Sequence, residues 1–465
     1  MNPNCCDVFV TDPKRFLSGW SACLKEDALL DKLGGIAVQP EALTWLLTPC
    51  RFKAELLSRI ENAKDSIYIA ALYLEDDEAG REILQALMTA KANNPALDVK
   101  ILVDFHRARR GLIGHKGDSG NYLMYRKVMA EAEHPIDIMG VPVKSREFMG
   151  VLHLKGFVID DAVIYSGASL NNIYLQQNDK YRFDRYHVIE SAELARSMRT
   201  MIQRYIIADP AVASLTQDAQ QEVLPPKTDV RSFKLRLSQA QYEFNATRSG
   251  NRVTPLLGLG RKHNLLNKAV VAMVEESKDR LFICTPYFNP PYILVRALAK
   301  HLRKGKRIDI VVGDKTANDF YIPPEQDFST IGALPYLYEQ SLRKFAKRQQ
   351  WAIDNGQLNI HLWKHGINSY HLKGISADGR KHLITGSNLN PRAWALDLEN
   401  GLLIHDESGS WKAQFEAEQS HILEHTQRLY HYSQVDTLQN YPAPVKKIMT
   451  RIRRLKADFL LRRIL

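Results

Sequence analysis

The sequence predicts an α/β protein made of two similar halves that share one site. Strand-like and helix-like runs alternate in the same order in each half, which is typical of sheets covered by helices. His153-Leu154-Lys155 followed by Asp160 recurs as His371-Leu372-Lys373 followed by Asp378. An apolar content of 45% over 465 residues is enough for two or three cores. We therefore expect central, mostly parallel sheets in two halves that are related by a pseudo-two-fold axis around one active site.

The chain divides into five segments. We expect an N-terminal segment without an assigned role, a first half, a connecting segment, a second half and a basic C-terminal helix; these are residues 1–49, 50–208, 209–251, 252–444 and 445–465. The connecting segment is polar, contains Pro225-Pro226, and includes a predicted helix within 230–244.

Each half opens with a strand, a helix and a second strand. The predicted ranges are 66–74, 80–92 and 98–104 in the first half, and 280–288, 293–303 and 308–314 in the second. Asp65 and Tyr73 of the first half have counterparts at one common spacing in the second, Asp279 and Tyr287. This spacing supports a duplication.

The duplicated motif is predicted to lie on a strand, 153–160 in the first copy. His153 and Lys155 would then point to the same face, because side chains alternate along a strand. A paired strand follows in each copy, 163–166 and 383–385, and ends in a glycine-led turn. Such a turn lets backbone amides and small polar side chains approach a phosphate closely. The candidate supporting residues of the two turns are Ser169, Asn171, Ser387 and Asn388.

Paired imidazoles and paired ammonium groups suit phosphoryl transfer without a metal or another cofactor. One histidine can attack phosphorus while the other moves protons. Lys155 and Lys373 can hold the oxyanion charge. Asp160 and Asp378 would orient and charge-balance the site.

The charge balance points to a polyanionic partner. The formal net charge is +11, which favours nucleic acid or an anionic membrane surface without separating the two. The five cysteines are irregularly spaced, so we expect reduced thiols and a cytoplasmic protein. No apolar run is long enough to span a bilayer, so any work on lipid would take place from the water side.

Residues 445–465 carry the strongest local charge. They contain eight Lys or Arg residues against Asp458, with apolar residues close to helical spacing. A basic amphipathic helix suits an anionic bilayer surface. The alternative is a helix that packs on the body with its basic face in water.

Other basic residues are candidates for substrate binding. Three follow the strand that ends near residue 104, three lie near the motifs, and one lies just past residue 314 together with an asparagine; these are Arg107, Arg109, Arg110, Arg182, Arg185, Arg392, Lys315 and Asn318. Loops after such strands commonly bind ligands. A solvated basic cluster is the alternative for the first three.

The duplicated motif with its glycine, serine and asparagine turn resembles the phospholipase D superfamily. Within it, the chain resembles the bacterial phosphatidylserine synthase family across residues 50–465, most clearly in 151–187, 311–323 and 370–400. Two departures stand out: the first copy has Gly167-Ala168-Ser169-Leu170-Asn171 where the superfamily has Gly-Ser-x-Asn, and the second has its glycine one place late.

This resemblance implies exchange of CMP on CDP-diacylglycerol for L-serine through a phosphatidyl-histidine, with His153 as nucleophile and His371 as base. It implies that a carboxylate from the opposite half orients each histidine. The candidates are Glu399 for His153 and Asp184 for His371. It also implies a cytoplasmic protein associated peripherally with the cytoplasmic face of the inner membrane.

The leaving group makes the two histidines unequal. CMP departs as a phosphate monoester whose second pKa is about 6, so it needs little protonation. The serine hydroxyl is far less acidic and needs a base.

Rival acceptors on the same scaffold are phosphatidylglycerol and water. A nucleic-acid phosphodiesterase is the rival from another class, but nucleic acid is not required and the motifs lack aromatic stacking clusters nearby. The sequence leaves the oligomeric state open.

Overall fold

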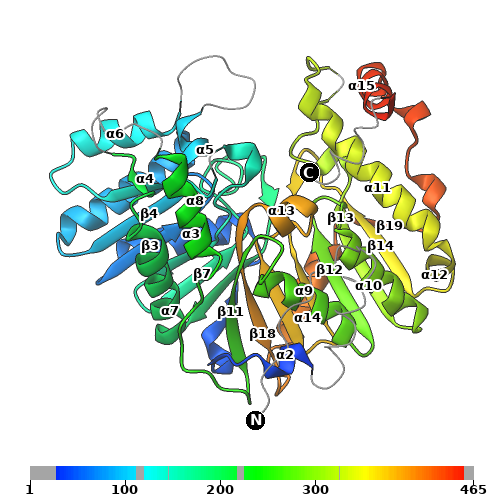
Figure 1. Cartoon of the computed structure of the whole chain (residues 1–465), viewed down its shortest axis with the longest axis horizontal. Coiled ribbons are helices and arrows are strands. Elements are labelled where there is room, and N and C mark those ends of the chain that lie inside the picture. Colours follow the sequence, from blue (N-terminus) through cyan, green and yellow to red (C-terminus); the bar gives the residue numbers. More distant parts are fainter. Residues whose placement is uncertain (1–27, 111–119, 145, 217–224, 324, 455–465) are drawn as a thin grey trace, which may run out of the picture.

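A computed structural model describes residues 28–110, 120–144, 146–216, 225–323 and 325–454. Two β-sheets stand side by side, each with helices packed against it; the first half of the chain forms one sheet, and the second half forms all of the other except its edge strand β1 (Figure 1). The α/β class and the two similar halves predicted from the sequence are confirmed.

The sheet of the first half has eight strands in the order β10-β5-β4-β3-β6-β7-β9-β2. Their bounds are β2 (Leu43–Trp45), β3 (Ser66–Ala70), β4 (Asp98–Asp104), β5 (Asp137–Val141), β6 (Gly156–Ile159), β7 (Ala162–Ser166), β9 (Tyr186–Glu190) and β10 (Ala213–Ser214). All five residues of β3 are buried, because helices cover both of its faces.

The sheet of the second half has nine strands in the order β1-β11-β18-β17-β16-β12-β13-β14-β19. Their bounds are β1 (Ile36–Ala37), β11 (Arg252–Leu259), β12 (Arg280–Thr285), β13 (Arg307–Gly313), β14 (Leu358–Trp363), β16 (Gly374–Ala377), β17 (Lys381–Thr385), β18 (Leu398–His405) and β19 (Thr426–Leu429). The run β14-β13-β12-β16-β17-β18 repeats the run β5-β4-β3-β6-β7-β9 of the first sheet.

The expectation of mostly parallel sheets is wrong. Within the described parts of these two sheets, only β3, β4 and β5, and their counterparts β12, β13 and β14, pair in parallel. The other pairings within the two sheets are antiparallel. Helical crossovers make neighbouring strands parallel, but a tight turn follows each motif strand at Asp160 and Asp378, and a tight turn produces a hairpin.

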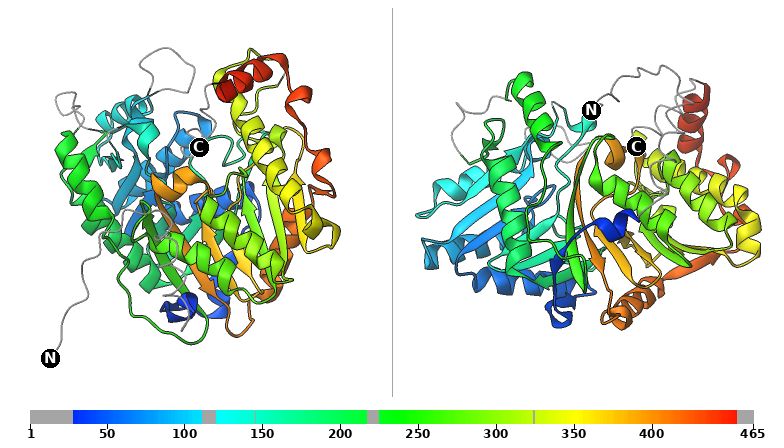
Figure 2. Two further views of the ribbon diagram at one scale, coloured as in Figure 1. Left: turned by 45° about the vertical axis from the view of Figure 1, so that its right-hand side comes forward. Right: turned by 60° about the horizontal axis from the view of Figure 1, so that its bottom comes forward.

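The helices pack in layers around the two sheets. On the first half they are α3 (Pro49–Glu61), α4 (Glu78–Asn93), α5 (Phe105–Arg109), α6 (Tyr122–Ala130), α7 (Ala192–Ile202), its π-helical continuation η3 (Gln203–Ile207), and α8 (Lys227–Leu237). On the second they are α9 (Leu265–Glu276), α10 (Tyr292–Arg303), α11 (Leu334–Arg348), α12 (Gln350–Asp354), α13 (Pro391–Ala395), α14 (Lys412–Leu423) and α15 (Ala443–Arg454). A single apolar cluster joins α7 and α8 to β11, β18 and α14, so the halves share a core. Figure 2 shows the two halves packed against each other.

Part of the segment before residue 50 ties the halves together. After the short helix α2 (Leu29–Lys32), β1 joins the edge of the second sheet and β2 joins the edge of the first. Between them, Trp411 Nε1 donates to Pro40 O at 2.7 Å. The described part of this segment, 28–49, therefore bridges both halves.

Three predicted elements begin or end elsewhere. The motif strand starts at Gly156 and not at residue 153, because Gly156 has φ +129° and takes the chain out of the sheet. The helix expected within 230–244 is α8, which ends at Leu237 in a turn at Ser238. Helix α15 begins at Ala443, and residues 455–465 of the predicted C-terminal helix lie outside the described residues. Among the helices that the structure describes, none is long and apolar enough to cross a membrane.

Candidate active site

Each motif histidine contacts a carboxylate from the opposite half. His153 Nδ1 lies 2.8 Å from Glu399 Oε2, and His371 Nδ1 lies 2.8 Å from Asp184 Oδ2. All four side chains are buried. These are the two contacts expected from the sequence. A histidine held through Nδ1 can use Nε2 for chemistry. In His371, Nε2 also lies 3.0 Å from Lys373 Nζ.

Backbone pairing between the halves sets up both contacts. Leu152 pairs in parallel with Leu398, and His153 N donates to Leu398 O at 2.9 Å. The second crossing is the two-stranded sheet of β8 (Arg182–Phe183) and β15 (Ser369–Tyr370), in which His371 N donates to Phe183 O at 2.8 Å. In each crossing the orienting carboxylate is the residue after the accepting carbonyl. One local arrangement therefore occurs twice.

A glycine follows each His-x-Lys and permits the crossing. Gly156 and Gly374 have φ of +129° and +138°. A Cβ on Gly374 would lie 2.6 Å from Leu383 O, and one on Gly156 would lie 2.6 Å from Met198 Cε. Any other residue would be strained at both positions. The glycine turns the chain so that His and Lys lie past the first residue of the strand, where the halves meet.

The two lysines are fully enclosed. Lys155 and Lys373 are each 1% exposed. Lys373 Nζ lies 3.2 Å from Asp184 Oδ2 and also contacts the His371 ring. Lys155 is held at its backbone by Asn400, whose Oδ1 accepts from Lys155 N at 2.9 Å and whose Nδ2 donates to Lys155 O at 2.8 Å.

Burial shifts the pKa values of the site residues toward their neutral forms. Burial, together with Lys155, holds the pKa of His153 well below its usual range. Burial and Lys373 do the same for the pKa of His371, to which His153 also contributes. Burial lowers the pKa of Lys155 to about 7 and raises that of Glu399 to about 8. Both imidazoles are therefore neutral near pH 7. An anionic phosphate bound between the two lysines would favour the charged form of the lysines.

Asp160 and Asp378 do not lie at the site, contrary to the expectation that they orient and balance it. Asp160 accepts from the backbone N–H groups of Lys64, Asp65 and Ser66, and Asp378 accepts from those of residues 278–280. Both sit in the turns at the far ends of β6 and β16, with φ of +48° and +56°. They cap the starts of β3 and β12, and the alternation of side chains along the strand could not reveal this.

The glycine-led turns make room for the site and do not offer their amides to it. A Cβ on Gly167 would lie 2.6 Å from Asp184 Oδ2, and one on Gly386 would lie 2.6 Å from Lys155 Cγ. The next amides, of Ala168 and Ser387, donate to the hydroxyls of Ser166 and Thr385. The turn amides expected to approach a phosphate are thus occupied at these two positions.

The polar side chains of the turns have local roles. Asn171 Oδ1 accepts from Tyr174 N at 2.9 Å, as Asn390 Oδ1 does from Ala393 N, so Asn390 is the counterpart of Asn171. Ser169 is buried beside them. Asn388 Oδ1 is buried without a hydrogen-bond partner among the described residues.

Two of the predicted basic residues lie over tyrosine rings: Arg182 near His371, and Arg107 at Tyr73. Arg182 lies over the ring of Tyr174, 4.7 Å from its centroid, and Tyr174 OH is 3.0 Å from His371 Nδ1. Arg107 lies over the ring of Tyr73 and binds Glu75 at 2.5 Å. Both guanidinium groups lower the otherwise burial-raised pKa of Tyr73.

The other arginines are bound elsewhere. Arg109 packs over aromatic rings, and Arg110 Nη2 binds Glu147 Oε1 at 2.6 Å. Arg392 Nε lies 3.2 Å from Asp397 Oδ2, next to His153. Arg185 forms a buried ion pair with Glu418 of α14, Nε to Oε1 at 3.1 Å. Arg185 thus links the halves and is not placed to bind substrate.

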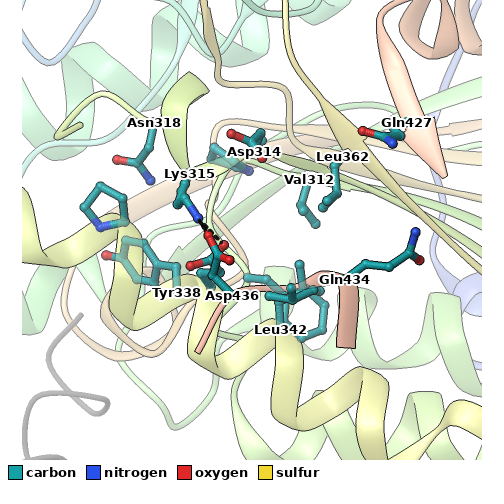
Figure 3. A pocket seen from close by; sticks show the side chains of 16 residues that line it. Val312, Asp314, Lys315, Asn318, Tyr338, Leu342, Leu362, Gln427, Gln434 and Asp436 are labelled. Carbon is teal, nitrogen blue, oxygen red and sulfur yellow. Dashed lines mark hydrogen bonds and ion pairs between the residues drawn. The ribbon is translucent and has the colours of Figure 1, made fainter. Parts of the chain in front are cut away.

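Lys315 and Asn318 line a separate cavity of ≈ 210 Å³ at the carboxyl ends of β12 and β13 (Figure 3). Lys315 Nζ lies 2.9 Å from Glu339 Oε1 and also contacts Asp436. Neither motif histidine lines this cavity. Tyr338 on its wall stacks on Tyr287, whose ring centroid is 6.4 Å from that of His371.

Several site residues were not predicted. Asn400 lies next to the predicted Glu399, and Tyr174 lies within a stretch that carried the resemblance, so neither was singled out. Tyr287 was noted as part of the repeat but not as part of the site. Asp319 lies 3.1 Å from Arg182 and accepts from Tyr287 OH at 2.8 Å. Its position after β13, next to Asn318, was the available signal.

Comparison with known proteins agrees with this geometry. A family model described as "Cardiolipin synthase, PLD-like domain" matches residues 56–206 and 270–423, one block in each half. CDP-diacylglycerol–serine O-phosphatidyltransferase of Haemophilus influenzae is 46% identical over 443 residues, 94% of this chain and 97% of that protein. The Escherichia coli protein of the same name is 45% identical over 445 residues, 95% of this chain and 98% of that one.

The solved structures include a similar fold over almost the whole chain. The crystal structure of phosphatidylserine synthase from Haemophilus influenzae superimposes with a TM-score of 0.91 at 45% identity, and the match covers 94% of this chain and 98% of that one. The chain therefore belongs to the phospholipase D superfamily, and within it to the family of the CDP-diacylglycerol–serine O-phosphatidyltransferases.

Proposed function

We propose that this protein transfers the phosphatidyl group from CDP-diacylglycerol to L-serine and releases CMP. The observation that carries the proposal is the 46% identity over nearly the full length of the Haemophilus influenzae transferase. The crossed pairs His153–Glu399 and His371–Asp184 support it, because they supply two neutral imidazoles in one enclosed site.

In the first step His153 Nε2 attacks the phosphorus that carries diacylglycerol. A bond forms between Nε2 and phosphorus, and the bond from phosphorus to the CMP oxygen breaks. The result is a phosphatidyl-histidine. Glu399 at Nδ1 balances the charge that the ring gains on substitution.

In the second step the serine hydroxyl attacks the same phosphorus. The new bond joins the serine oxygen to phosphorus, the bond to His153 Nε2 breaks, and the hydroxyl proton passes to His371. Asp184 at Nδ1 stabilises the imidazolium that forms. Lys155 and Lys373 balance the charge of the phosphoryl oxygens in both steps.

The direct test is CMP release from CDP-diacylglycerol with and without serine. We expect serine to accelerate release and to yield phosphatidylserine, and labelled donor alone to leave a phosphatidyl adduct on wild-type protein but not on His153→Ala. Some release without serine is expected, because water can also attack the intermediate. Serine-independent release without phosphatidylserine would indicate a hydrolase, and release driven by phosphatidylglycerol would indicate cardiolipin synthesis. An adduct from a labelled oligonucleotide would indicate a nucleic-acid phosphodiesterase.

We also propose that α15 contacts an anionic phospholipid surface on the cytoplasmic face of the inner membrane. Val445 and Met449 pack against Tyr336, Leu337 and Tyr441. The opposite side is exposed and basic, with Lys447, Arg451, Arg453 and Arg454. Helix α15 lies beside α11 at the outer edge of the second half (Figure 1). The apolar residues hold the helix, and the basic face suits anionic headgroups.

Substitution tests this better than truncation, because removing 445–465 would uncover Tyr336 and Leu337. The variant replaces Lys447, Arg451, Arg453 and Arg454 with Gln, and the control replaces the exposed residues Lys300, Arg303 and Lys304 at the end of α10. We expect weaker, less salt-sensitive binding to anionic vesicles for the variant only. Equal loss in both would mean that overall charge, and not α15, governs the attachment.

A further inference from the structure

The ion pair between Arg182 and Asp319 lies beside His371. Some hydrogen-bond donors and acceptors of this pair have no partner among the described residues. Arg182 Nε lies 3.1 Å from Asp319 Oδ1 and 3.2 Å from Ser369 Oγ. Among the described residues, no hydrogen bond of its terminal nitrogens Nη1 and Nη2 is found. Asp319 Oδ1 is buried and, within the part of the chain that the structure describes, accepts no hydrogen bond and contacts only Arg182. Oδ2 is taken by Tyr287 OH.

This spare capacity leaves the pair able to bind a ligand. The side chains are only 14% and 12% exposed, and a buried charge with unused donors or acceptors costs stability unless a ligand completes it. The buried pair Arg185–Glu418 also holds polar atoms without a hydrogen-bond partner among the described residues. The Arg182–Asp319 pair differs in its place, because Arg182 lies over the ring of Tyr174, whose hydroxyl contacts His371. The Arg182–Asp319 pair presents a cation and an anion side by side.

The proposed chemistry fixes the side on which the acceptor enters. In an in-line displacement the leaving group departs opposite the nucleophile. CMP therefore leaves on the side away from His153, and the acceptor must return along the same line. That side is the side of His371, which takes the acceptor proton. Tyr174 and Tyr287 connect His371 directly to Arg182 and Asp319.

The matching position near His153 has the opposite charge. The residue two places before the orienting carboxylate is Arg182 in the first half and Asp397 in the second. Asp397 is already bonded, to Arg392 Nε at 3.2 Å and to Val151 N at 3.0 Å. The open cation–anion pair therefore occurs on the His371 side and not at the matching position near His153.

We propose that Arg182 and Asp319 form the subsite that recognises the acceptor as an amino-acid zwitterion. The Arg182 guanidinium takes the carboxylate through Nη1 and Nη2, and Asp319 Oδ1 takes the ammonium. This assignment rests on the proposed transfer to serine and deepens it. The two contacts place the serine hydroxyl near His371, and they exclude acceptors that lack either charge.

Wild-type protein tests the proposal with three acceptors at matched donor concentration. L-Serine carries both charges, ethanolamine lacks the carboxylate, and 3-hydroxypropanoate lacks the ammonium. The measurement is kcat/KM for phosphatidyl transfer, read from the labelled lipid product. We expect each truncated acceptor to be worse than serine by about tenfold or more, the effect of one charge-assisted hydrogen bond. Equal use of all three acceptors would overturn the subsite while leaving serine transfer intact.

Two variants assign each charge. Asp319→Asn should shrink the preference for serine over 3-hydroxypropanoate by about tenfold, and Arg182→Gln should shrink the preference for serine over ethanolamine by a similar factor. Ratios are compared because both residues also affect His371, so overall turnover will fall. Asp279→Asn, at an exposed ion pair with Arg307, is the matched control.

The experiment distinguishes a wrong subsite from a wrong proposed function. If Asp319→Asn and Arg182→Gln slow all three acceptors by one common factor, the pair acts only on the surroundings of His371 and the subsite is wrong. If wild-type protein forms no phosphatidylserine at all, the proposed function itself is wrong. Variants that do not fold leave the acceptor series on wild-type protein as the deciding measurement.

Discussion

At the scale of single residues, the two histidines have similar surroundings but different neighbours. Each is buried and held through Nδ1 by a carboxylate at 2.8 Å. Beside His371 lie Tyr174, Arg182 and Asp319, whereas Asp397 and Arg392 lie beside His153. Sequence symmetry in the motif therefore coexists with different electrostatic surroundings, which is what two different chemical tasks require.

Replacing His371 with Ala should separate the two steps. CMP is a good leaving group, so we expect the variant to form phosphatidyl-enzyme from labelled CDP-diacylglycerol while transfer to serine falls by about 10²–10⁴-fold. Rapid mixing followed by denaturation and counting of protein-bound label measures the adduct. Complete absence of adduct would contradict the division of labour, and His153→Ala serves as the adduct-free control.

The pH dependence should differ from that of an exposed histidine enzyme. The pKa values of His153 and His371 are held well below 6.5, so both rings stay neutral as the pH falls from 8 to 6. The pKa of Lys155 is lowered to about 7, so its cation is lost as the pH rises above that value. We expect kcat/KM for CDP-diacylglycerol, which reports the free enzyme, to decline above about pH 7. A profile that rises with pH through 6.5 would contradict this assignment.

At the scale of elements, the strand that carries each motif serves the site at one end and stability at the other. Its first residue is Gly156 or Gly374, which releases the His-x-Lys segment toward the opposite half. Its far end is a turn whose aspartate binds three backbone amides. The aspartate of the motif thus lies in a turn that connects two strands, away from the histidine.

Asp378→Asn should test this structural role. Asparagine tolerates the positive φ of +56°, but its amide group would face an N–H donor. We expect a loss of about 1–3 kcal/mol in the free energy of unfolding, with kcat of the folded protein nearly unchanged. Denaturant unfolding and turnover per folded molecule measure the two. The control Asp279→Asn, 65% exposed, should change stability by less than about 0.5 kcal/mol. A large fall in kcat without destabilisation would return Asp378 to the chemistry.

Local patterns in the sequence predicted the elements well but the contacts between them poorly. Periodicity placed β3, α4 and β4 to within a few residues, because buried strands and amphipathic helices have distinct patterns. The contact of His153 with Glu399 spans 246 residues, and only the family resemblance suggested it. The role of Asp160 was wrong because a turn aspartate and a site aspartate look alike in sequence. Asp319 was missed although it follows β13 directly after the predicted Asn318, because that position alone does not say which residue after the strand faces the site.

At the scale of the whole molecule, both halves contribute to each catalytic pair. The halves are joined at the site by the crossings Leu152–Leu398 and β8–β15. The shared apolar cluster joins them elsewhere. The buried pair Arg185–Glu418 adds a third connection. One chain therefore supplies both motif histidines and both carboxylates that contact them.

Mixing His153→Ala with His371→Ala protein should consequently restore no activity. Each variant lacks one histidine of its own site, and a complete site exists only within a chain. Serine-dependent CMP release by the mixture should equal the average of the two variants measured separately. Recovery toward a quarter or more of wild-type activity would mean that halves exchange between chains. Each variant alone, at the same total concentration, is the control.

The contacts of each histidine with a carboxylate of the other half also matter for the order in which the chain is synthesised. Synthesis proceeds from the N-terminus, so His153 and its lysine emerge long before Glu399, which follows 246 residues later. Until then the imidazole has no carboxylate to orient it and no enclosing partner half to exclude water. We therefore expect a growing chain to be unreactive toward lipid donors while it is still on the ribosome. Reactivity appears only once the last third of the polypeptide has been made and has docked.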